Sequence, residues 1–229
     1  MVAVKKAVSV SNVQAAKFHI LDFTGEWYAA VGAPERSGTH IIIGPPKNGK
    51  TSFEMMYAKY LCTFERTALD SIEEGLSLTI QMAMQRVHME EAGTRLVLYD
   101  KVEIDELREK LDARKSPNII FIDSVQFADM TFKQYKELKK RYPNKLFVYV
   151  SHVDGNKPEG SCAKRIYKDA AVIWRIEGFR AFPTSRFQTH DVPGTPIDIW
   201  KEEADKYWSA QNQTNLTGSP QARGRSGVS

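Results

Sequence analysis

The stretch from Gly44 to Ser52 has the residue types of a phosphate-binding loop. It reads Gly44-Pro45-Pro46-Lys47-Asn48-Gly49-Lys50-Thr51-Ser52, with both glycines, the second lysine and the threonine at the spacing of that motif. In such a loop backbone N–H groups contact phosphate oxygens, the lysine adds positive charge, and the threonine hydroxyl can hold Mg²⁺. The stretch therefore predicts binding of ATP and Mg²⁺.

A magnesium ion also needs a carboxylate at the end of a neighbouring strand, because hard cations prefer oxygen ligands. Asp100 and Asp123 each follow an apolar run. We favour Asp123, whose run Ile119–Ile122 is apolar at every position, as expected for a buried strand next to the loop-bearing strand. Asp100 precedes an acid-rich helical segment, where helix capping explains it.

Hydrolysis would need a group that polarises water, and an acid at the end of a parallel strand suits this role. Glu73 and Glu74 follow the run Ala68–Ile72. Either could instead be part of the acidic first turn of the next helix. On the residues alone, the catalytic and the structural interpretation are equally supported.

The elements around these residues predict an α/β fold. A β-branched strand over 39–43 precedes the loop, and an amphipathic helix follows it, with apolar residues at helical spacing from Phe53 to Leu61. Further strands are predicted over 68–72, 96–99, 119–122, 146–150 and 172–176, separated mostly by helical or polar segments. This alternation predicts a mainly parallel sheet flanked by helices, with antiparallel edge strands over 180–187 and 195–200.

The chain divides into three predicted parts. Residues 1–38 form a lead-in packed on the core, 39–208 form the core, and 209–229 form a polar tail predicted to be disordered. Trp200 and Trp208 are predicted to anchor the C-terminal segment by packing. No apolar run is long enough to span a membrane, and the two cysteines have no metal-site spacing, so we expect a cytoplasmic protein.

Four further segments carry a resemblance to a known family. They are Ser71-Ile72-Glu73-Glu74-Gly75, Ile119–Gln126, Val150-Ser151-His152-Val153 and Ser185-Arg186-Phe187. Together with the phosphate loop they resemble RecA-like P-loop ATPases, in the branch of RadA and the replicative helicase motor, over Gly32–Phe187. Residues around Trp27, Gly32–Glu35, Ile199–Glu203 and Trp208 also resemble small stand-alone ATPases of bacterial mobile elements and prophages.

The resemblance implies a role for each segment. Glu73 becomes the expected catalytic base, with Glu74 in reserve, and Asp123 is favoured for magnesium. His152 matches the residue that senses the γ-phosphate, and Arg186 matches an arginine that reaches the nucleotide of a neighbouring subunit. The sequence departs from the family at Thr184, where a lysine is usual, and at Gln188, where a glycine is usual.

The loop predicted after His152 resembles the DNA-facing loops of the family. Its basic residues are Lys157, Lys164, Arg165 and Lys168, which could contact phosphates or be ordinary surface residues. The resemblance thus implies an ATPase acting on single-stranded DNA in recombination, repair or replication, as a homo-oligomeric ring or filament. A regulatory or loader ATPase with a replication or recombination protein as partner is the alternative, and a small-molecule kinase is a third.

Overall fold

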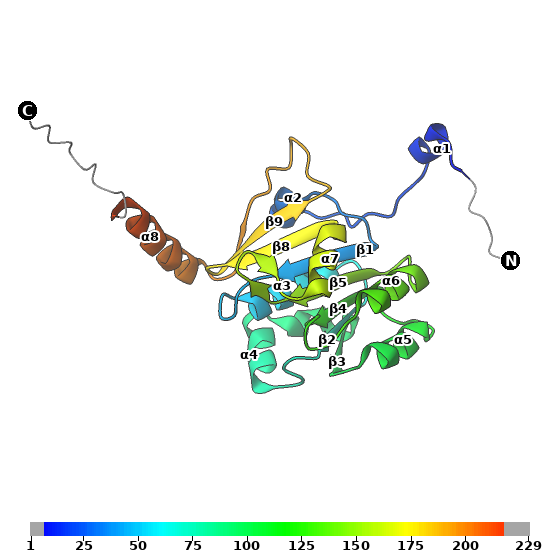
Figure 1. Cartoon of the computed structure of the whole chain (residues 1–229), viewed down its shortest axis with the longest axis horizontal. Coiled ribbons are helices and arrows are strands. Elements are labelled where there is room, and N and C mark those ends of the chain that lie inside the picture. Colours follow the sequence, from blue (N-terminus) through cyan, green and yellow to red (C-terminus); the bar gives the residue numbers. More distant parts are fainter. Residues whose placement is uncertain (1–6, 218–229) are drawn as a thin grey trace, which may run out of the picture.

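The structure, a computed structural model, is built on one large sheet and describes residues 7–217, with side chains placed up to residue 212. The strands of this sheet are β1 (Gly38–Ile43), β2 (Thr67–Ser71), β3 (Leu96–Asp100), β4 (Ile119–Asp123), β5 (Leu146–Ser151), β8 (Val172–Glu177), β9 (Arg180–Ser185) and β10 (Ile197–Asp198). Their order is β10-β9-β8-β1-β5-β4-β2-β3 (Figure 1). The six strands from β8 to β3 are parallel, whereas β9 and β10 are antiparallel, as the sequence predicts.

The prediction that the strand ending at Asp123 lies next to the loop-bearing strand is wrong. β4, which ends at Asp123, does not pair with β1, because β5 lies between them and pairs with both. All the strands of this central group are buried, so burial alone cannot tell which of them are adjacent.

Helices cover both faces of the sheet. The helices of the described residues are α1 (Val10–Gln14), α2 (Gly25–Val31), α3 (Lys50–Cys62), α4 (Leu78–Arg86), α5 (Ile104–Asp112), α6 (Phe132–Arg141), α7 (Ser161–Asp169) and α8 (Lys201–Thr217), with a 3₁₀ segment η1 (Met89–Arg95), and α2 to α7 form the two covering layers. Because alternate strand residues point to opposite faces, Ile42 and Phe121 pack with α2, α3 and α4. Ile41 and Ile122 pack with α5, α6 and α7 on the other face. The fold is therefore a three-layer sandwich.

An aromatic cluster fixes α3 against the sheet. The Trp27 ring from α2 stacks on Tyr60 at 4.7 Å and on Tyr57 at 5.3 Å, and it meets Trp174 of β8 edge-on at 5.9 Å. Offset stacks and edge contacts are the favoured aromatic geometries. Because the phosphate loop leads directly into α3, this packing also fixes where the loop lies.

The two ends of the chain differ from the sequence expectation. Disorder from Ser209 is wrong for residues 209–217, because α8 continues through Thr217; residues 218–229 lie outside the described part of the chain. At the other end, α1 buries none of its residues and projects away from the body (Figure 1). No helix within residues 7–217 is long and apolar enough to cross a membrane.

Candidate nucleotide-binding site

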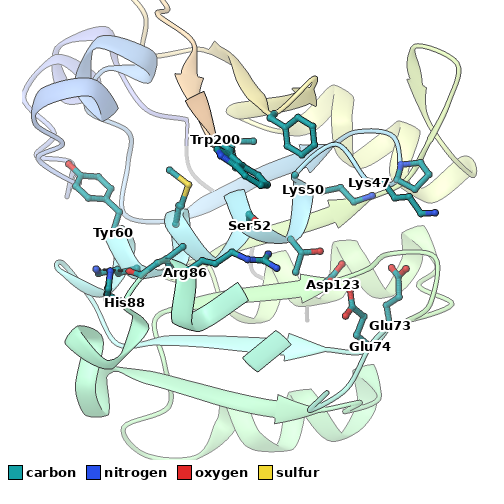
Figure 2. Close-up of a pocket in the computed structure, with 18 of the residues that line it drawn as sticks. Lys47, Lys50, Ser52, Tyr60, Glu73, Glu74, Arg86, His88, Asp123 and Trp200 are labelled. Atoms are coloured by element: carbon teal, nitrogen blue, oxygen red, sulfur yellow. Dashed lines mark hydrogen bonds between the residues drawn. The ribbon is translucent and has the colours of Figure 1, made fainter. Parts of the chain in front are cut away.

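The carboxyl ends of the parallel strands meet at one edge of the sheet, where the structure has a cavity of about 1140 Å³. Residues of the predicted phosphate loop line it: Pro46, Lys47, Gly49, Lys50, Thr51 and Ser52. The predicted acids Glu73, Glu74 and Asp123, together with His152, line the same cavity. Figure 2 shows the three acids at one end of the cavity and Tyr60 and His88 at the other.

The phosphate loop is held in shape by the segment after β8. The N–H of Gly178 donates to Asn48 Oδ1 at 2.8 Å, and the N–H of Phe179 donates to the Asn48 carbonyl at 3.2 Å. Gly49 has a φ of 95°, a left-handed conformation that favours glycine. A Cβ on Gly44 would lie 2.6 Å from the carbonyl oxygen of Ile176, so this position also requires glycine.

Lys50 extends from the start of α3 back across the loop. Its Nζ donates to the Gly44 carbonyl at 3.1 Å and lies 3.3 Å from Nδ1 of His152. Burial lowers the pKa of Lys50, and the nearby carboxylates of Asp123 and Glu73 oppose that shift. The ammonium group is thus positioned at the loop, among acids that compensate its charge.

His152 connects this lysine to Glu73. Its Nε2 lies 2.9 Å from Glu73 Oε2, and its backbone N–H donates to Gln126 Oε1 at 3.3 Å. The Gln126 amide in turn donates to Ser151 Oγ at 2.9 Å and to the Glu159 carbonyl at 2.7 Å. Gln126 is not among the predicted site residues, although it ends the quoted segment Ile119–Gln126 and could have been found there.

Asp123 ends β4 and is 5% exposed. Burial, and then the charge of Glu73, raise the pKa of its carboxyl group. Behind it on α3, Glu54 is 1% exposed, and neither of its carboxyl oxygens has a hydrogen-bonding partner among the described residues. Burial raises the pKa of Glu54 well above its ordinary value, and the charge of Asp123 adds to this shift. No sequence pattern marks Glu54, the one acid within α3.

The oxygen donors at this end of the cavity suit a hard divalent cation. Thr51 and Asp123 line the same cavity, and a hydroxyl with a carboxylate is a donor set of the kind Mg²⁺ accepts while keeping several waters. Burial raises the pKa of both Asp123 and Glu54, and a bound cation would stabilise their charged forms. Asp100 does not line the cavity; its Oδ1 accepts from the N–H of Leu76 at 3.2 Å.

Glu73 and Glu74 both line the cavity but have different partners. Glu73 interacts with His152, whereas a Glu74 oxygen accepts a hydrogen bond from the Thr79 hydroxyl at the start of α4. Glu74 is therefore held by α4, the helix that follows it. Glu73 is held by His152, which also contacts Lys50.

Trp200 lines the cavity beside the phosphate loop, and the prediction that it is a packing anchor is wrong. Its side chain is 54% exposed and meets Phe179 edge-on at 6.1 Å. Figure 2 shows it on the side of the cavity opposite Arg86 of α4. By contrast, Trp208 packs edge-on against Phe182 at 5.4 Å, as an anchor should.

The remaining predicted residues lie outside the cavity. Arg186 is exposed after β9, and its Nη2 donates to the Lys168 carbonyl at 3.3 Å. Lys157 lies in a small hairpin of β6 (Val153–Asp154) and β7 (Lys157–Pro158). Lys164, Arg165 and Lys168 are exposed on α7, so the predicted continuous loop after His152 is instead a hairpin followed by a helix.

No model of a known protein family matches this sequence, and the search of curated proteins found no match. Solved structures do resemble its fold. The flagellar accessory protein FlaH from Methanocaldococcus jannaschii matches with a TM-score of 0.54 and 14% identity, over 78% of this chain and 91% of that chain. A second solved structure, an ATPase domain, matches with a TM-score of 0.48 and 14% identity, over 71% of this chain and 85% of that chain.

At this identity the likeness to FlaH shows the fold alone. The chain has an α/β fold with a mostly parallel central sheet and antiparallel strands at its C-terminal edge, the arrangement of RecA-like P-loop ATPases.

Proposed function

We propose that this protein is a magnesium-dependent ATPase. The observation that carries the proposal is the contact of one imidazole, His152, with both the phosphate-loop lysine and Glu73, which lies two residues after β2. A lysine among carboxylates could be a structural ion pair, but here the group lies in the wall of a cavity that begins at a phosphate loop.

The residues divide the work of hydrolysis between them. The loop N–H groups and Lys50 bind the β- and γ-phosphates, and Thr51 and Asp123 hold the cation. Bound Mg²⁺ supplies charge neutralisation of the phosphate oxygens. Glu73 orients a water molecule and accepts its proton as the water oxygen bonds to the γ-phosphorus and the bond to the β-phosphate oxygen breaks, which yields ADP and phosphate. His152 holds Glu73 and senses the γ-phosphate.

The nucleotide base binds beside Trp200. The exposed indole lies in the cavity wall next to the phosphate loop, and an aromatic face is a stacking surface for a purine. Arg86 from α4 lies on the other side of the cavity, where its guanidinium group can contact the second face of the base.

The ATPase acts on DNA, in the cytoplasm, in recombination, repair or replication, with a replication or recombination protein as a further partner. Support comes from the link between the nucleotide site and the basic residues: Gln126 contacts both His152 and the Glu159 carbonyl, just before α7 begins. A movement of His152 would therefore be transmitted through Gln126 to α7, which carries Lys164, Arg165 and Lys168. DNA and the γ-phosphate would then be coupled ligands.

The protein assembles as a homo-oligomer in which Arg186 completes the site of a neighbouring subunit. Arg186 is exposed and does not line the cavity of its own chain, as a group acting in trans must be. The test is phosphate release by wild type, Lys50→Ala and Arg186→Ala, each with and without single-stranded DNA. Mixing the two variants should restore activity, because some sites then combine an intact lysine with an intact neighbouring arginine. Wild-type activity of Arg186→Ala would overturn the trans assignment.

A further inference from the structure

A basic surface covers α6 and α7, on the face of the sheet opposite α3 and the nucleotide cavity. We call it the α6–α7 basic face, and its members are Lys133, Lys136, Lys140, Lys164, Arg165 and Lys168. All six side chains are exposed, and no ion pair involving them is found in residues 7–217. Arg186 adds a seventh positive charge beside Lys168.

Side-chain contacts join the two helices into one surface. The Arg165 guanidinium lies 4.8 Å from the centre of the Phe132 ring, and Lys136 Nζ lies 5.3 Å from the same centre. Beside them, Lys139 binds Asp169 at 2.5 Å, which neutralises the acid at the end of α7. The positive charges of both helices therefore face solvent together.

The spacing on α6 matches a nucleic-acid backbone. Lys133, Lys136 and Lys140 follow one another at i, i+3 and i+7, so they form a stripe about 10 Å long on one side of the helix. Phosphates of one strand of duplex DNA are spaced by about 3.4 Å along the axis, so the stripe spans about three of them.

The chemistry of the face favours double-stranded DNA over the other polyanions. Single strands are held largely by stacking on exposed aromatic rings, but Phe132 is covered by Lys136 and Arg165. A surface that binds membranes usually has exposed apolar side chains beside its positive charges. No large apolar residue of α6 or α7 is exposed. The face therefore offers positive charges that suit contacts with phosphate groups and has no exposed surface for bases or acyl chains.

We propose that the α6–α7 basic face binds the phosphate backbone of double-stranded DNA without reading the bases. The inference rests on the proposed DNA-directed function, and it adds a duplex site away from the nucleotide cavity. Such contacts release counterions, so affinity falls steeply with salt, by a slope of about −0.9 for each phosphate contacted.

The test removes the α6 charges only, in the triple variant Lys133→Gln, Lys136→Gln, Lys140→Gln. The control is Lys110→Gln, Lys201→Gln, Lys206→Gln, which removes as many helical lysines from α5 and α8, each of them ion-paired with an acid of its own helix. Binding to a labelled duplex of mixed sequence is measured by fluorescence anisotropy between 50 and 250 mM salt. We expect the α6 variant to lose about 2.7 units of salt slope and at least tenfold in affinity at the lowest salt. The control should keep the wild-type slope.

Three results would overturn the proposal: no duplex binding by wild type at the lowest salt, equal losses in the α6 variant and the control, or tighter binding to anionic lipid vesicles than to duplex. Thermal melting confirms that each variant is folded. The proposed function is judged separately, because ATP hydrolysis and its stimulation by single-stranded DNA should survive the α6 substitutions. If hydrolysis is absent but duplex binding follows the α6 charges, the ATPase proposal fails and the duplex site stands.

Discussion

The imidazole of His152 lies between Glu73 and Lys50, with Nε2 at 2.9 Å from the Glu73 carboxylate and Nδ1 at 3.3 Å from the Lys50 ammonium. These residues come from the ends of β5 and β2 and from the start of α3, which are far apart in the sequence. One ring thus contacts the group proposed to activate water and the group proposed to bind the γ-phosphate. If a bound phosphate displaced Lys50, the His152 ring could move with it and shift the Glu73 carboxylate.

Replacing His152 with alanine should slow hydrolysis more than it weakens nucleotide binding. Glu73 would lose the group that holds its carboxylate, and a positioning loss of this kind costs about 100-fold in rate. We expect kcat to fall by about that factor while ATP affinity changes less than about fivefold. The measurement is steady-state phosphate release beside equilibrium binding of a fluorescent ATP analogue. A variant with unchanged kcat would show that the contact has no catalytic role.

Substitution of the two adjacent glutamates separates their roles. Glu73→Gln should reduce kcat by at least about 100-fold with ATP binding retained, because an amide cannot accept the proton of water. Glu74→Gln, the matched control, should retain most activity, since Glu74 interacts with Thr79 at the start of α4. Single-turnover hydrolysis compares the chemical step directly. If the Glu74 variant is the inactive one, the assignment of the base is reversed.

Trp200 should contribute to nucleotide affinity by stacking. An aromatic stacking contact to a base contributes about 1–3 kcal/mol, so Trp200→Ala should weaken ATP binding by about 5-fold to 140-fold. Trp200→Phe keeps a ring and should lose less. Isothermal titration gives both affinities, and ATP should quench tryptophan fluorescence in wild type but less in the phenylalanine variant. Equal affinity in wild type and the alanine variant would place the base elsewhere.

Buried His40 should make stability depend on pH. It is 1% exposed, its Nδ1 lies 2.8 Å from the Tyr57 hydroxyl, and burial lowers its pKa from 6.5 to about 3. Because the unfolded chain binds the proton more readily, the contribution of neutral His40 is fully present above pH 6.5 and is lost as the pH falls toward 3.

The matched variant is His40→Gln, which is neutral at every pH and retains a hydrogen bond to Tyr57. Between pH 7 and pH 5 wild type should lose about 2 kcal/mol more free energy of unfolding than the variant does. Urea denaturation at pH 7 and at pH 5 measures this difference. Comparing the two proteins cancels the opposite contribution of buried acids such as Asp70, whose pKa is raised by burial to about 6. Parallel curves for the two proteins would refute a buried neutral histidine.

The local parts of this site could be predicted from the sequence. The phosphate loop, the strand before it and the helix after it are contiguous, and glycine at 49 and an apolar run at 119–122 reflect local backbone and burial demands. The order of strands could not be predicted in this way. β5 lies between β1 and β4 because of long-range packing, which leaves no local mark on Ile119–Asp123.

Other features depend on tertiary contacts that no pattern encodes. Trp200 and Trp208 are the same residue type in the same C-terminal segment, yet one lies in the cavity wall and the other packs on Phe182. Glu54 looks like an ordinary helical acid until its burial behind Asp123 is seen. Residues 154–165 are rich in glycine and lysine, which predicts a loop, yet α7 begins within them.

The central claim is that the cavity at Gly44–Thr51 hydrolyses ATP, and magnesium-dependent phosphate release by the purified full chain tests it most directly. Wild type, Lys50→Ala and the surface control Lys110→Ala are compared with and without magnesium, in the presence of DNA. We predict release by wild type and the control that requires magnesium, and at least about 100-fold less release by Lys50→Ala. Absence of release from wild type, or equal release by Lys50→Ala, would contradict the claim.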